Sequence, residues 1–135
     1  MIKRIDHIGV VVGSIRDMMK TLSGTLGFAE TMSLKDPQGQ FRSSLLEVNG
    51  ACIELVEPLT DEGPVARFFR ERGNCLHHLS LEVEDIEGVV TLLAQKGIRL
   101  VNQKPEIVGE MKTIFVHPGS TGGLLVELVE KNPKK

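Results

Sequence analysis

Apolar and polar residues alternate in short stretches along the first half of the chain, interrupted by one stretch with helical spacing. The alternation predicts strands over 5–12, 28–34, 41–48 and 51–57. Apolar spacing predicts a helix over 15–26, with Ser14 as its N-cap and Gly27 ending it in a left-handed conformation. Asn49-Gly50 is typical of a tight hairpin turn. Together these elements form one βαβββ module.

The second half repeats this order. Strands are predicted over 78–83, 98–103, 113–117 and 124–130. A helix is predicted over 86–96, with Asp85 as its N-cap and Gly97 ending it. Between the halves, residues 62–72 have helical character and are interpreted as a linker helix packing over the sheet.

Four landmarks of the two halves correspond at nearly constant spacing. The pairs are His7 with His78 and Ile15 with Ile86, each 71 positions apart, Gly27 with Gly97 at 70, and Glu54 with Glu127 at 73. The sequence therefore predicts a duplicated α+β fold within one domain over 1–135. Module one spans about 4–57, the linker about 58–74 and module two about 75–131. We expect the two modules to form a curved, partly closed barrel-like sheet with a metal cleft.

The residues repeated at equivalent strand positions have the chemistry of metal ligands. A single strand histidine or glutamate is usually an ordinary structural or solvent-facing residue, but His7, Glu54, His78 and Glu127 occur at symmetric positions. A carboxylate within so apolar a strand is costly unless it is exposed, paired or bound to metal. Two imidazoles and two carboxylates suit one divalent ion such as Co, Ni, Zn, Mn or Fe. His77 is next to His78 in the same strand, and its side chain is expected to point to the opposite face, away from the predicted ligands.

Composition argues against nucleic-acid partners and membrane spans and favours a cytoplasmic protein. The net charge of −2 and the absence of Trp and Tyr argue against a nucleic-acid partner. No apolar run approaches a membrane span of ~20 residues, and the N-terminus is too short and charged for a signal peptide. Cys52 and Cys75 lie in apolar surroundings and are interpreted as buried free thiols in a cytoplasmic protein.

The motifs DHIGVVV, IELVEPL, PVARFF, GNCLHHLSLEVEDI, FVHP and GGLLVELVE resemble the vicinal oxygen chelate superfamily and, within it, the methylmalonyl-CoA epimerases. The resemblance covers nearly the whole chain and implies that His7, Glu54, His78 and Glu127 bind the metal. It further implies a small-molecule thioester substrate. The sequence departs from the epimerases in lacking a carboxylate over 40–44, in having HPG instead of HPK at 117–119, and in having Met18 and Met19 in the first helix.

An epimerase needs two acid/base groups on opposite faces of the substrate. Our hypothesis assigns this role to Glu54 and Glu127, which are related by the repeat, in a metal-dependent reaction at the α-carbon of an acyl-CoA thioester. Arg42 is a candidate partner for a substrate carboxylate or phosphate, and a solvent-facing role is its alternative. A glyoxalase I-like lyase, a dioxygenase and a non-catalytic binding protein are the other candidate functions. The alternating apolar strands and linker helix favour a homodimer.

Overall fold

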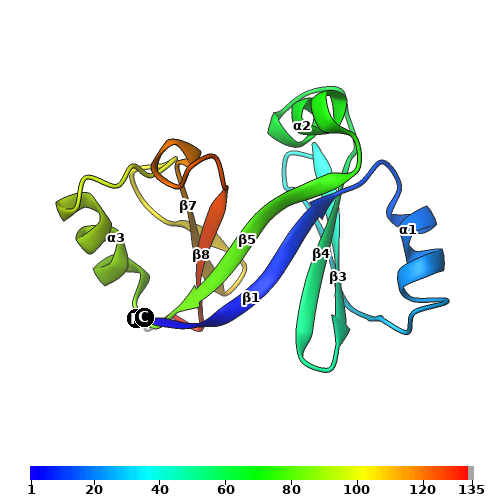
Figure 1. The fold of residues 1–135 in the computed structure, drawn as a ribbon, viewed down its shortest axis with the longest axis horizontal. Coiled ribbons are helices and arrows are strands. Elements are labelled where there is room, and N and C mark those ends of the chain that lie inside the picture. The colour runs from blue at the N-terminus through cyan, green and yellow to red at the C-terminus, as the bar shows by residue number, and fades with distance from the viewer. Residues whose placement is uncertain (134–135) are drawn as a thin grey trace. The chain divides into compact units, whose positions relative to one another are not determined.

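The computed structural model describes residues 1–133 and has the α+β class and the two βαβββ modules predicted from the sequence (Figure 1). The first module contains β1 (Ile2–Val11), α1 (Ile15–Leu22), β2 (Ala29–Lys35), β3 (Phe41–Val48) and β4 (Ala51–Pro58). The helix α2 (Pro64–Arg72) follows it. The second module contains β5 (Cys75–Val83), α3 (Ile86–Gln95), β6 (Glu106–Val108), β7 (Met111–Val116) and β8 (Val126–Lys131), with a 3₁₀ turn at Pro118–Ser120.

The chain divides into two compact units whose boundaries cut through two strands. One unit is His7–His77, and the other combines Met1–Asp6 with the chain from His78 onward. The predicted linker helix therefore belongs to the same unit as module one. Within the first unit the strand order is β2-β3-β4-β1, and within the second it is β5-β8-β7-β6. In each, the first strand of the module pairs in parallel with the last, and the other pairings are antiparallel.

The core of the first unit lies between α1 and its sheet. Its buried residues are Val12, Ile15, Leu46 and Leu55. The Ser14 hydroxyl accepts a hydrogen bond from the Asp17 N–H at 3.1 Å, which confirms the predicted cap. The helix ends at Leu22 and not at residue 26, because the next residues, Ser-Gly-Thr, have low helix propensity and form turns. The predicted hairpin is confirmed by positive φ at both Asn49 and Gly50.

The core of the second unit lies between α3 and its sheet. Its buried residues are Val83, Ile86, Val89, Ile114, Val116 and Leu128. The Asp85 carboxylate accepts from the Gly88 N–H at 3.1 Å, as predicted for a cap. Gly97 follows the helix with φ of 71°, which suits a residue without a side chain. No helix within residues 1–133 has the length and apolar character needed to cross a bilayer.

The predicted strand over 98–103 is wrong. Only Leu100 forms a β-bridge there, with Val116 of β7. The segment runs beside β7 through two flanking backbone hydrogen bonds, from the Val101 N–H to the Phe115 carbonyl and from the His117 N–H to the Arg99 carbonyl. It then leaves β7 through the polar sequence Asn-Gln-Lys-Pro, and the strand that pairs with β7 begins at Glu106. Proline lacks the N–H that a continuing ladder requires.

Candidate metal-binding residues

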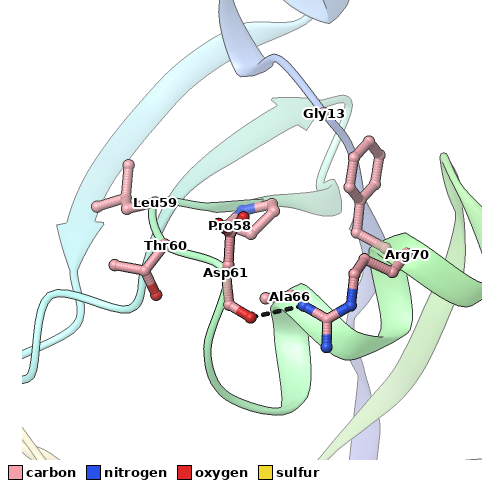
Figure 2. Close-up of a pocket in the computed structure, with 8 residues that line it drawn as sticks. Gly13, Pro58, Leu59, Thr60, Asp61, Ala66 and Arg70 are labelled. Atoms are coloured by element: carbon pink, nitrogen blue, oxygen red, sulfur yellow. Dashed lines mark hydrogen bonds between the residues drawn. The ribbon is translucent and has the colours of Figure 1, made fainter.

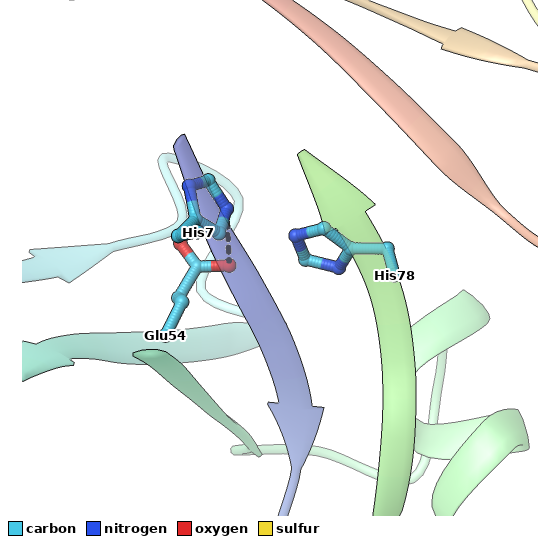
Figure 3. A group of neighbouring side chains, drawn as sticks. All are labelled: His7, Glu54 and His78. Carbon is cyan, nitrogen blue, oxygen red and sulfur yellow. Dashed lines mark ion pairs between the residues drawn. The ribbon is translucent and has the colours of Figure 1, made fainter. Parts of the chain in front are cut away.

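In the first unit, His7 and Glu54 lie together on one face of the sheet. Parallel pairing of β1 with β4 places Gly9 in register with Glu54, and His7 precedes Gly9 by two positions. Because side chains two apart in a strand share a face, the imidazole and the carboxylate extend on the same side. The His7 Nε2 atom lies 3.8 Å from Glu54 Oε1 (Figure 3). His7 is buried, with 8% of its surface exposed.

In the second unit, His78 and Glu127 have the same relation. Parallel pairing of β5 with β8 places Ser80 in register with Glu127, and His78 precedes Ser80 by two positions. The Ser80 hydroxyl donates a hydrogen bond to Glu127 Oε1 at 2.7 Å, so the carboxylate lies on the face of β5 that carries His78. His78 is 6% exposed, and its ring meets Phe115 edge-on with 5.8 Å between ring centroids.

The two units thus repeat one arrangement of an imidazole and a carboxylate. In both, the histidine lies two residues before the position in register with the glutamate. The buried imidazole and nearby carboxylate have the donor atoms that a divalent ion of intermediate hardness takes. Each unit therefore supplies half of the predicted ligand set, and the binding of one ion by both halves is a prediction.

His77 and His117 have other surroundings. The His77 ring packs edge-on against Phe68 of α2, with centroids 4.7 Å apart, and burial lowers the pKa of this imidazole. His117 caps the 3₁₀ turn, where its Nδ1 accepts from the Gly119 N–H at 2.9 Å.

The side chains of Arg42 and Glu54 extend from opposite faces of the sheet. Glu54 is in register with Leu45, so Arg42, an odd number of residues away on β3, projects toward the side of α1. Its Nε donates to Glu57 Oε2 at 2.5 Å. There Arg42 lines a cavity of about 790 Å³ with Arg16, Glu30 and other residues of the first unit. The register does not support a contact between Arg42 and a ligand on the His7–Glu54 face.

Glu57, the hydrogen-bond partner of Arg42, has an equivalent in the second unit, Glu130. Arg42 is in register with Glu57 of β4, and Lys112 is in register with Glu130 of β8. Glu57 accepts a hydrogen bond from the Ile15 N–H at 3.0 Å, and Glu130 accepts one from the Ile86 N–H at 2.9 Å. Each glutamate therefore holds the start of its module's helix. Sequence reasoning missed this role, although Glu57 and Glu130 have the same 73-residue offset as Glu54 and Glu127.

We expect Glu57→Ala to lower the free energy of unfolding by about 1–3 kcal/mol, because the partly buried Ile15 N–H and Arg42 both lose their acceptor. Glu57→Gln retains an acceptor oxygen and should lose less. The measurement is urea unfolding, with Glu47→Ala on an exposed position of β3 as the control. Equal midpoints for Glu57→Ala and Glu47→Ala would contradict this role.

A second cavity in the first unit, of about 320 Å³, lies where the chain leaves β4 and enters α2 (Figure 2). Its wall includes Asp61, whose carbonyl accepts a hydrogen bond from Arg70 at 2.5 Å. Gly13 allows the Phe69 ring to approach, since an added Cβ would lie 2.7 Å from Phe69 Cζ. The residues that line this cavity include none of the four predicted ligands.

Comparisons with known proteins agree with the duplicated fold. A model of the glyoxalase/bleomycin resistance protein/dioxygenase superfamily matches residues 6–130. The Bacillus subtilis protein YqjC is 30% identical over 94% of this chain and 91% of its own length. The ethylmalonyl-CoA/methylmalonyl-CoA epimerase of Cereibacter sphaeroides is 29% identical, with 95% of this chain and 98% of the relative covered.

Solved structures extend the similarity to three dimensions. The crystal structure of methylmalonyl-CoA epimerase from Mycobacterium tuberculosis has a TM-score of 0.91 and 28% identity, covering 98% of this chain and 90% of that one. The resemblance inferred from the sequence motifs is confirmed. The chain belongs to the glyoxalase/bleomycin resistance protein/dioxygenase superfamily.

Proposed function

We propose that this protein is a metal-dependent epimerase that acts at the α-carbon of an acyl-CoA thioester. The observation that carries the proposal is the repeated register of His7 with Glu54 and of His78 with Glu127. Similarity to epimerases of methylmalonyl-CoA and ethylmalonyl-CoA, over nearly the full length of the chain, supports the reaction class. In this proposal residues 1–135 act as one domain, in which the four side chains converge on one ion.

The chemistry of the donors fits a divalent ion. In the first unit a buried imidazole nitrogen and a carboxylate oxygen already lie 3.8 Å apart on one face, within reach of a common ligand. With two nitrogen and two oxygen donors, the set suits Co, Ni, Zn, Mn or Fe(II), and a six-coordinate ion would retain two positions for a chelating substrate. When bound, the ion supplies Lewis acidity toward the thioester carbonyl and the α-carboxylate.

Glu54 and Glu127 are proposed to carry the proton. Inversion at the α-carbon requires removal of a proton from one face and delivery of a proton to the other. The two glutamates come from equivalent strands of the two modules, which suits groups acting from opposite sides. The imidazoles of His7 and His78 remain ligands. In this proposal Arg42 contacts a part of the substrate that lies in the α1-side cavity, which its side chain lines.

The proposal also includes a small-molecule thioester as the substrate, a cytoplasmic location and a homodimeric assembly. The epimerase reaction is tested by incubating the Co-loaded protein with methylmalonyl-CoA in deuterated water, followed by NMR or mass spectrometry of the α-position. The proposal predicts deuterium at the α-carbon and interconversion of the epimers. A parallel assay with methylglyoxal and glutathione tests the glyoxalase-type lyase. Turnover of the hemithioacetal without label in the acyl-CoA would replace the epimerase proposal.

A further inference from the structure

The two halves of the proposed metal site differ at one position. Gly9 is in register with Glu54, whereas the equivalent position in the second unit, in register with Glu127, is Ser80. The Ser80 side chain is fully buried, with 0% of its surface exposed, and its hydroxyl donates to Glu127 Oε1 at 2.7 Å. The fold itself does not require a hydroxyl at this position, since the first module forms the same strand pairing around a glycine.

The hydrogen bond fixes the direction of the Glu127 side chain. A glutamate has several rotamers of similar energy, and holding one of them costs conformational entropy. A short bond to a hydroxyl away from water favours a single arrangement. Since His78 and Ser80 are two residues apart on β5, the bond holds the carboxylate on the face that carries the imidazole.

We propose that Ser80 is a positioning residue that orients the Glu127 carboxylate for metal binding, an inference that rests on the proposed function. Side chains that hydrogen-bond to metal ligands fix their orientation, and their loss lowers metal affinity by about 10–100-fold. Ser80 does not touch the substrate or the ion. Its effect passes through the Glu127 carboxylate, to which its hydroxyl donates, so the affinity for the ion is a direct measure of its role.

The test is isothermal titration of the chelator-treated full chain with CoCl₂, together with the visible absorption spectrum of bound Co²⁺. We expect Ser80→Ala to raise the dissociation constant for Co²⁺ about 10–100-fold and to change the spectrum. Ser80→Cys retains a weak donor of similar size and should have an intermediate affinity. The matched control is Ser44→Ala, which removes a buried hydroxyl from the α1 side of β3, where 2% of Ser44 is exposed.

The results distinguish a failure of the proposed role of Ser80 from a failure of the proposed metal site. Thermal unfolding of each variant in EDTA reports the stability of the apoprotein, and a purely structural Ser80 would lower that stability without weakening Co²⁺ binding by the folded fraction. Affinity and spectrum unchanged in Ser80→Ala overturn the role of Ser80 while leaving the site intact. Absence of Co²⁺ binding by the unmodified protein overturns the site and the role together.

Discussion

Glu127→Gln is expected to reduce epimerisation of methylmalonyl-CoA by about 10²–10⁴-fold, the usual contribution of a positioned acid/base group. The amide keeps an oxygen that ligates the ion but has no carboxylate to accept a proton. One face of the α-carbon then loses its proton carrier, and inversion needs both faces. Glu54 remains on the other face, so deuterium should still enter one epimer without inversion.

Substitution of Glu54 tests whether the two glutamates act on opposite faces of the α-carbon. Glu54→Gln should reduce inversion by a similar factor of about 10²–10⁴, but it should restrict deuterium incorporation to the opposite epimer. The measurement is α-proton exchange in deuterated water, started separately from each epimer at saturating Co²⁺. Glu110→Gln, at an exposed position between β6 and β7, controls for the charge change. Inversion at the unmodified rate in either variant, or loss of exchange for the same epimer in both, would contradict the paired roles.

Much of the fold was predictable because local signals and the repeat agree. Ser14 and Asp85 cap their helices as expected, and the Asn49-Gly50 hairpin forms as its residue types predict. The repeat added what local patterns lack, since an offset of 71 or 73 residues places His7 and His78, or Glu54 and Glu127, at equivalent strand positions. Parallel pairing in both modules then puts each histidine and its glutamate on one face.

Other features depend on tertiary pairing that periodicity does not encode. Residues 98–103 are apolar enough for a strand, but the partner of β7 is the exposed three-residue segment Glu106–Val108. Arg42 was considered for substrate because of its charge, whereas the register of β3 with β4 turns it toward α1 and Glu57. Ser80 gave no signal as a single residue, and its relation to Glu127 emerges only from the pairing of β5 with β8.

His7→Ala and His78→Ala are each expected to abolish the stabilisation of the protein by Co²⁺. An ion that binds only the folded chain adds about 2.7 kcal/mol to the free energy of unfolding at a concentration 100 times its dissociation constant. In the proposed site the ligands come from both units, so removal of either imidazole takes one of four donors from the same ion. The measurements are denaturant unfolding with and without Co²⁺ at that fixed concentration and metal content after gel filtration.

The unmodified protein should bind one Co²⁺ per chain, and both variants should unfold alike with and without the ion. Unfolding in EDTA shows whether each variant retains its fold, and His117→Gln removes an imidazole outside the proposed ligand set as the control. Full stabilisation retained by one histidine variant would remove that unit from the site. Two ions per chain, each lost with a different histidine, would mean that each His–Glu pair binds its own metal. Because the pairs belong to separate compact units, the shared loss of a single ion is the result that establishes their convergence.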